Sequence, residues 1–115
     1  MEKTKKGQVW VMHGDVPGEK MPTWTERRIK AYGEGMMLVE NVFKTGDIAP
    51  EHAHPHTQIT YVIEGAMEFT VENETKVLRK GDSVFIAPDA VHRAIAVEDS
   101  LIIDLFAPMR EDFVE

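Results

Sequence analysis

GDIAPEHAHPHTQITYVIEG, residues 46–65 of the chain, combines closely spaced histidines with a β-rich run. Alternate residues of an extended chain share one face. Four potential ligands therefore share one parity within this stretch: His52, His54, His56 and Gln58. A metal ion needs at least three side chains that converge to about 2.0–2.2 Å from one point, and His92 is the natural contributor from a second strand. The stretch therefore predicts a metal site.

The alternative is a loop of surface histidines, and for any single histidine this would be the better interpretation. An H-x-H pair together with Gln58 and the distant His92, in a β-rich chain, favours the metal site instead. The chain has no cysteine, so any metal must be bound by nitrogen and oxygen atoms. Zinc fingers and iron–sulfur clusters are thereby excluded.

Outside this stretch, short apolar runs separated by turn residues predict an all-β chain. The runs rich in Val, Ile, Phe and Tyr are 9–13, 28–32, 36–43, 58–63, 67–71, 75–78, 83–86, 92–97 and 101–106. Glycine-containing or polar breaks lie between them, and no helical periodicity is present beyond a short turn near 23–27. The pattern indicates a sandwich or barrel.

Length and composition limit the function classes. The 115 residues fit one domain, 1–115, in which residues 1–6 are expected to be a frayed tail. The 13 basic and 20 acidic residues give a formal charge of −7, which repels phosphate backbones, so we expect no nucleic-acid partner. No apolar run approaches the roughly 18 residues of a membrane span, and the N-terminus lacks the apolar stretch of a secretory signal. We therefore expect a cytoplasmic protein with no membrane partner.

In two runs, 36–39 and 101–106, apolar residues occupy both faces of the expected strand. A strand with one face in solvent should instead alternate apolar and polar residues. Burial in a homodimer and a place in the middle of a two-sheet core are both open explanations. Tyr61, Phe69 and Phe85 are expected in the core.

The spacing of Gly46, His52, His54, Gln58 and Gly65 resembles the first cupin motif, G-x5-H-x-H-x3-E-x6-G. Residues 81–92, GDSVFIAPDAVH, resemble the second motif, G-x5-P-x-G-x2-H, with Ala and Asp in place of the usual Pro and Gly. The resemblance implies the cupin double-stranded β-helix, a jelly-roll barrel, with one divalent metal ion. The implied metal ligands are His52, His54, Gln58 and His92.

Gln58 stands where cupins usually have Glu, so the implied donor set is neutral and leaves the full charge of the ion to act on substrate oxygens. In the alternative, Gln58 only hydrogen-bonds nearby and His56 is the fourth ligand. Pro55 disturbs the strand between the two positions, which favours Gln58. Imidazole and amide ligands suit Zn, Ni, Fe, Mn or Co.

Residues 52–65 and the segment 104–113, DLFAPMREDF, are similar to the KdgF-type pectin-degradation cupins. Those proteins convert 4,5-unsaturated monouronates, released from pectin or alginate, to linear keto forms. The resemblance of the D-x-F-x3-R segment implies Asp104 and Arg110 as the catalytic pair and Phe106 as an aromatic of the substrate pocket. We place His56 in the same pocket and expect a small anionic sugar acid as the partner.

The chemistry of that reaction fits these residue types. Ring opening moves a proton from the anomeric hydroxyl to carbon, which is work for a carboxylate such as Asp104, and Arg110 can hold the substrate carboxylate bidentately. Burial should raise the pKa of Asp104 unless Arg110 offsets it. The structural alternatives are an Asp104 paired with Arg93 or Arg110, and an Arg110 in a solvated tail. A non-catalytic sugar-acid-binding or sensory cupin and a metal-dependent dioxygenase remain the alternative functions.

Overall fold

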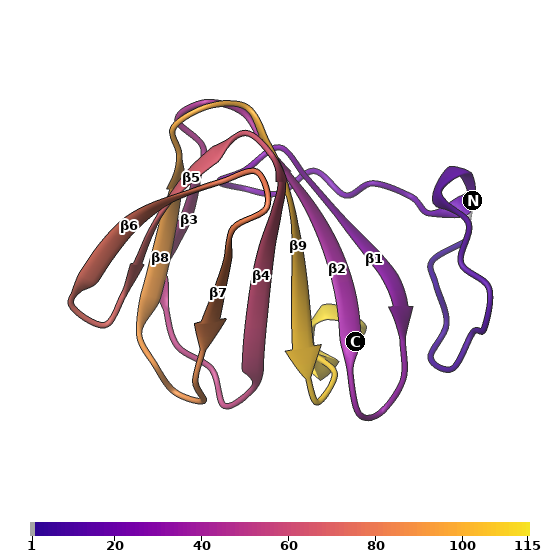
Figure 1. Cartoon of the computed structure of the whole chain (residues 1–115). Helices are drawn as coiled ribbons and strands as arrows, with labels where there is room; N and C mark the ends of the chain where they lie inside the picture. Colours follow the sequence, from indigo (N-terminus) through magenta and orange to yellow (C-terminus); the bar gives the residue numbers. More distant parts are fainter. Residues whose placement is uncertain (1) are drawn as a thin grey trace.

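The computed structural model describes residues 2–115, and within this range nine strands form two antiparallel sheets (Figure 1). The strands are β1 (Glu26–Tyr32), β2 (Met37–Phe43), β3 (Ile48–His52), β4 (Thr57–Glu64), β5 (Ala66–Val71), β6 (Glu74–Arg79), β7 (Ser83–Ile86), β8 (His92–Ala96) and β9 (Ser100–Ala107). The five-stranded sheet has the order β1-β2-β9-β4-β7 and the four-stranded sheet β3-β8-β5-β6. The expected all-β jelly roll is confirmed.

Alternation along β2 and β9 builds the core. Met37, Val39 and Phe43 of β2 are buried, and the residues between them are partly exposed. β9 repeats this pattern with Ile102 and Phe106 buried. Side chains from both sheets then form one apolar cluster of Phe43, Val62, Met67, Phe69, Leu78, Ala94, Ala96 and Ile102. The two sheets are held together mainly by this removal of apolar surface from water.

The outer face of the five-stranded sheet is also apolar. Tyr61 and Phe85, expected in the core, are 42% and 61% exposed on this face, so that expectation was wrong. Tyr61 faces outward because its neighbour Thr60 points into the core, and successive side chains of a strand point to opposite faces. Phe69 is buried as expected.

Two strand assignments differ from the sequence prediction. Residues 9–13 do not form a strand, and Trp10 is 80% exposed, so an apolar run without a partner strand stays irregular. β3 was missed because its residues, IAPEH, contain Pro50 and a charge. β3 lies at the edge of its sheet, where a missing backbone N–H is tolerated. This edge strand carries His52 and pairs it with His92 of β8.

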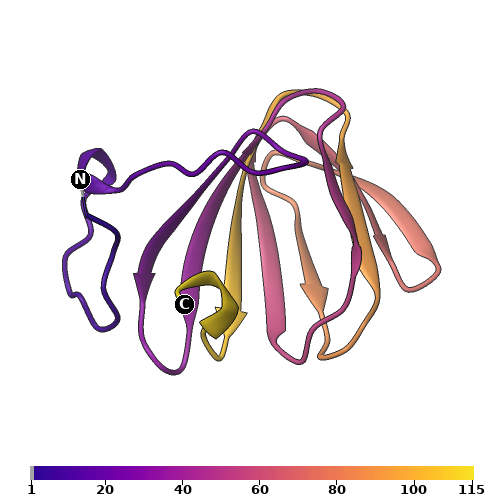
Figure 2. The ribbon, with the colours of Figure 1, turned by 180° about the vertical axis from the view of Figure 1, so that it is seen from behind.

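The two ends of the chain lie against the five-stranded sheet. The short 3-10 helix η1 (His13–Asp15) precedes β1, and η2 (Glu111–Phe113) follows β9. Seen from behind, η2 lies on the inner side of the sheet (Figure 2), where the rings of Phe113 and Phe106 are 5.6 Å apart. The expected tail, 1–6, includes residue 1, which lies outside the described residues. Thr4 Oγ1 donates to the carbonyl of Ile29 at 2.8 Å, so this stretch contacts β1.

Gly65 forms the tight turn between β4 and β5. Its φ is 91°, a left-handed value that glycine adopts without strain. A Cβ at this position would also lie 2.2 Å from the carbonyl oxygen of Asp99. Both facts explain why this position of the motif is glycine. Among the described residues, no helix is long and apolar enough to span a membrane.

Candidate metal centre

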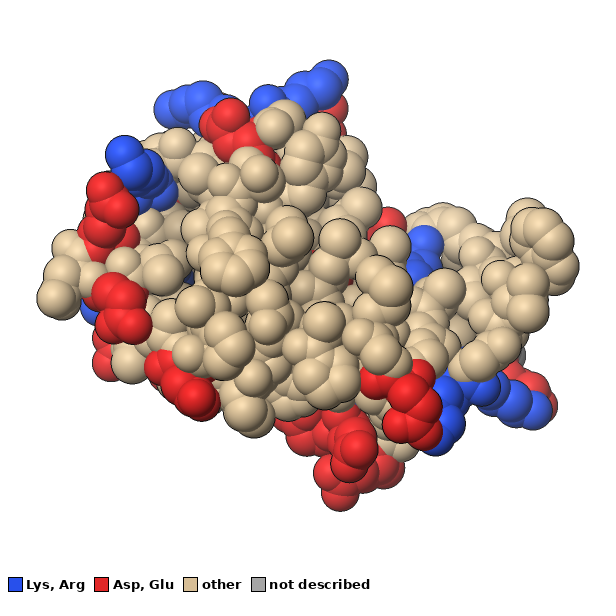
Figure 3. Space-filling model, turned by 60° about the horizontal axis from the view of Figure 1, so that its bottom comes forward, with Lys and Arg blue, Asp and Glu red and all other residues tan. Residues whose placement is uncertain are grey.

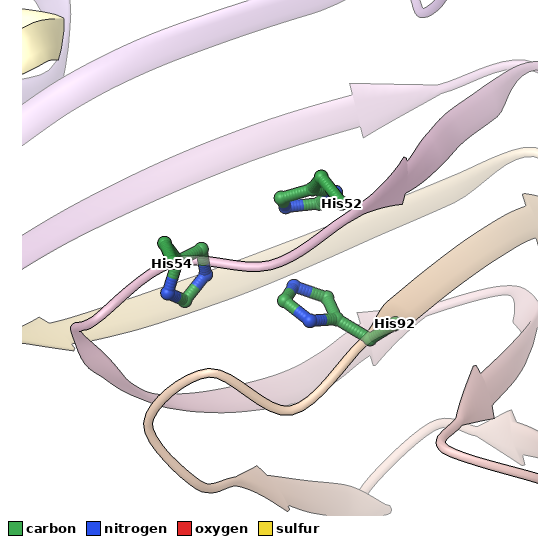
Figure 4. Close-up of side chains that lie close together, drawn as sticks. All are labelled: His52, His54 and His92. Atoms are coloured by element: carbon green, nitrogen blue, oxygen red, sulfur yellow. The ribbon is translucent and has the colours of Figure 1, made fainter.

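Three imidazoles converge between the sheets (Figure 4). His52 ends β3, His92 begins β8, and His54 lies in the loop that leads to β4. Their ligand atoms all lie within 4.8 Å of one another, and the ring centroids of His52 and His92 are 4.2 Å apart. The β3–β8 register sets this spacing because it places these two residues directly opposite each other. His54 and His92 are buried and His52 is exposed, so the cluster is reachable from solvent.

Backbone carbonyls orient all three rings in the same way. The Nδ1 atoms of His52, His54 and His92 lie 2.7, 3.0 and 2.8 Å from the carbonyl oxygens of Pro50, His56 and Ala90. Each Nδ1 therefore donates, which leaves a lone pair on each Nε2. His92 Nε2 is buried and has no hydrogen-bond partner among the described residues. Three such lone pairs in one place fit a bound cation.

Burial keeps two of these rings neutral. It lowers the pKa of His92 to about 4, and nearby Arg110 also acts to lower it. Burial likewise lowers the pKa of His54. Neutral imidazole is the form that binds metal, so both side chains are in their ligand state at neutral pH.

Gln58 completes the cluster through the oxygen of its amide. Gln58 Oε1 lies 2.9 Å from His54 Nε2, and Gln58 Nε2 donates to Thr60 Oγ1 at 3.0 Å and to Asp104 Oδ1 at 3.3 Å. These two acceptors fix the amide so that its oxygen faces the imidazole lone pair. Two electron-rich atoms that face each other are stabilised by a cation, so the donor set fits a divalent ion held by the three histidines and Gln58.

His56 does not join this group. Its ring lies 5.5 Å from that of His54 and 6.5 Å from that of Phe106, and it is absent from the converging set. The expectation that all four same-parity side chains share one face fails because the chain bends at Pro55 and His56 between β3 and β4. Although His56 lies beside Phe106, it is not among the residues that line the cavity, so its place in the substrate pocket stays a prediction.

Asp104 is buried behind Gln58 and accepts hydrogen bonds from three side chains. Thr60 Oγ1 donates to Oδ1 at 2.5 Å, Asn41 Nδ2 donates to Oδ2 at 2.8 Å, and Gln58 is the third donor. Burial raises the pKa of Asp104, and the three donors act in the opposite direction. The structure pairs it with neither Arg93 nor Arg110. Those two arginines contact Glu51 and Asp112 instead.

Asn41 and Trp24 were missed by the sequence analysis. Trp24 Nε1 donates to Asn41 Oδ1 at 3.0 Å, which turns the amide nitrogen of Asn41 toward Asp104. The available signal was parity, because Asn41 lies between Val39 and Phe43 on the buried side of β2. A buried amide on an apolar face needs hydrogen-bond partners, and this could have indicated a polar network.

Arg110 lies in the interior and not in a solvated tail, with 11% of its side chain exposed. Its Nε and Nη2 atoms donate to the two carboxylate oxygens of Asp112 at 3.0 and 2.8 Å. Its Cζ lies 5.1 Å from the centroid of the Phe106 ring. Asp112 thus occupies the Nε–Nη2 edge of the guanidinium.

A cavity of about 300 Å³ connects these groups. Its wall includes His52, Gln58, His92, Asp104, Phe106 and Arg110. Charged side chains are sparse at the end of the molecule shown in Figure 3 and gather around its rim. The face in Figure 3 shows no broad basic patch, and Arg27, Arg93 and Arg110, which could attract an anion, lie in the cavity wall.

This three-histidine centre in a two-sheet barrel is typical of cupins, and the sequence agrees: the chain belongs to the cupin domain family, which it matches over residues 39–106. Within this family it is KdgF-like. It is 32% identical to the pectin degradation protein KdgF of Dickeya dadantii (strain 3937) over 102 residues, which cover 87% of this chain and 93% of that protein.

Solved structures give the same result. KdgF from Halomonas sp. superposes with a TM-score of 0.87 and 33% identity, covering 92% of this chain and 98% of the other. An RmlC-like cupin from Shewanella frigidimarina NCIMB 400 superposes with a TM-score of 0.91 and 31% identity, covering 96% and 99%. The resemblance inferred from the motifs is confirmed.

Proposed function

We propose that the protein is a metal-dependent enzyme that opens 4,5-unsaturated monouronates from pectin or alginate to their linear keto forms. The observation that carries the proposal is the contact of Asp104 with Gln58, because it couples a buried carboxylate to the histidine cluster. The similarity to proteins named for pectin degradation supports this choice of substrate class.

In this proposal His52, His54, His92 and Gln58 hold one divalent ion, of Zn, Ni, Fe, Mn or Co. The bound ion would supply positive charge that polarises substrate oxygens, undiminished by any anionic ligand. The side chain of Phe106 forms part of the pocket wall, and the ring of His56 lies 6.5 Å from that of Phe106, outside the residues that line the cavity. Arg110 contributes positive charge close to His54 and His92.

Asp104 carries the proton. The anomeric hydroxyl gives its proton to the carboxylate as the ring C–O bond breaks, and the resulting enolate receives that proton at carbon. The substrate is isomerised and no other reactant is consumed. A carboxylate with a raised pKa suits a group that must both accept and return a proton near neutral pH.

The test is to mix metal-loaded protein with freshly prepared unsaturated uronate and follow the loss of the enol-ether absorbance. We expect a rate well above that of the uncatalysed reaction, and a His54→Ala variant as control should not exceed the background. An unchanged background rate with stoichiometric metal would refute the enzyme. Binding without turnover would then favour the sugar-acid-binding cupin, and oxygen consumption in the presence of substrate would favour the dioxygenase.

We further propose that the outer face of the five-stranded sheet joins two copies of the chain. Phe85, Ile59 and Leu105 are direct neighbours across β7, β4 and β9 and point away from the core. Exposed apolar area of this kind is typical of a subunit contact. Phe85→Glu should convert a dimer to a monomer in light scattering, whereas Val77→Glu on the opposite sheet should not. A wild-type monomer would contradict the proposal.

A further inference from the structure

Arg27, which the sequence analysis did not single out, lies in the wall of the same cavity. It belongs to β1 and pairs with Asn41 of β2, on the inward side of the sheet. Only 12% of its side chain is exposed. A guanidinium is always charged at neutral pH, so this position places a cation in the wall of the cavity that His52, His92 and Asp104 also line.

The hydrogen-bonding capacity of Arg27 is not satisfied within the described residues. Its Nε is buried and has no partner there. Its Nη2 lies 3.7 Å from Glu19 Oε2, too far for a hydrogen bond. A buried donor without an acceptor is costly, and in a cavity wall it is explained most simply by a ligand that supplies the acceptor.

The ring of Phe113 packs against two guanidinium groups that differ in their hydrogen bonding. The Cζ atoms of Arg27 and Arg110 both lie 4.2 Å from the centroid of its ring. Stacking on a ring leaves the edge of a guanidinium free to donate hydrogen bonds. In Arg110 the Nε–Nη2 edge is occupied by Asp112, whereas in Arg27 the Nε has no partner among the described residues and the Glu19 carboxylate lies 3.7 Å from Nη2.

We propose that Arg27 is the main binding group for the carboxylate of the ligand, through its Nε and one terminal nitrogen. The proposal rests on the proposed function for the identity of the ligand, a monomeric sugar acid. The cavity of about 300 Å³ is at the lower end for small-molecule sites, which suits one sugar unit with its carboxylate at Arg27 and its hydroxyl oxygens at the metal centre. Arg110, already paired, then stabilises the pocket and adds charge.

The first test measures binding of galacturonate and of its neutral parent, galactose, to the zinc-loaded protein by calorimetry. We expect Arg27→Gln to weaken galacturonate binding about 10- to 100-fold, the usual effect of losing a charge-assisted pair, and to leave galactose binding unchanged. Arg28→Gln is the matched control, because Arg28 is the next residue and forms its ion pair with Glu26. It should bind both sugars as the wild type does.

Arg27→Lys keeps the positive charge but cannot donate two parallel hydrogen bonds, so it should bind galacturonate more tightly than Arg27→Gln and more weakly than wild type. If Arg27→Gln does not fold, the comparison of Arg27→Lys with wild type replaces it. Galacturonate binding within threefold of wild type in a folded variant, or equal loss of both sugars, would overturn the proposal. A wild type that opens unsaturated uronate, with an unchanged KM in Arg27→Gln, would also overturn it and leave the proposed function intact. A wild type that binds galacturonate through Arg27 without turnover would instead overturn only the enzyme.

Discussion

Replacing Gln58 by Glu tests the assignment of Asp104 as a carboxylate behind the metal centre. The change would place a second carboxylate oxygen about where Gln58 Nε2 now lies, 3.3 Å from Asp104 Oδ1. Two unit charges at this distance repel by about 5 kcal/mol at an effective dielectric constant of 20. The folded protein avoids this cost by keeping one proton on the pair.

Keeping that proton makes stability depend on pH. Carboxyl groups in the unfolded chain titrate near pH 4, so each pH unit above this value costs the variant about 1.4 kcal/mol relative to wild type. Since the folded state then binds more protons than the unfolded state, stability falls as pH rises. Gln58→Glu should lose up to about 4 kcal/mol relative to wild type at pH 7 and less at pH 5, against a total of about 5–15 kcal/mol for a small domain.

Urea unfolding of the metal-free proteins at pH 5 and pH 7, in a chelator, measures this difference. Gln58→Met is the control, because it removes the amide without adding charge and should show no additional pH dependence. A pH-independent loss in Gln58→Glu would refute the reasoning, since it would mean that Asp104 is not ionised at neutral pH.

Three further predictions follow from the site and the turn. His54→Ala should abolish stoichiometric metal in elemental analysis, whereas Asp104→Ala should keep the metal and lose turnover; normal turnover would contradict its role. Because burial lowers the pKa of His92 to about 4, the unfolded metal-free chain binds more protons than the folded chain between about pH 6.5 and 4. Unfolding free energy should therefore fall as pH is lowered through this window, by up to about 3 kcal/mol from His92, and His92→Gln should keep only the part of the slope that comes from His54. Gly65→Ala should destabilise by about 3 kcal/mol or more in thermal unfolding, and an unchanged Tm would show that the turn can relax around Asp99.

Sequence spacing predicted the histidine cluster because its key distance is encoded in strand register. His52 and His92 face each other across β3 and β8, and the two motifs contain both. The irregular part could not be predicted in the same way. The bend at Pro55 and His56 removes His56 from the cluster although its parity matches that of His52.

The groups that surround the cluster depend on which face of each strand is buried. Tyr61 and Phe85 have core-like side chains but the outward parity, so their apolar character was misleading. Arg27 and Asn41 have polar side chains but the inward parity, on strands whose other inward residues are apolar. Only the pairing of β1 with β2 brings these two together. The pattern of apolar runs, turn residues and motif spacing therefore indicated the fold, whereas the tertiary contacts were needed to find the polar groups inside it.

The hydrogen bonds around Asp104 have a direction. An indole nitrogen can only donate, so Trp24 fixes the orientation of Asn41, and the amides of Asn41 and Gln58 both present N–H groups to the carboxylate. Of the three donors to Asp104, only Thr60 can change from donor to acceptor, because its hydroxyl accepts hydrogen bonds as readily as it donates them. A proton that arrives on Oδ1 can thus be accommodated by rotating a single hydroxyl, while the amide oxygen of Gln58 keeps facing the histidines.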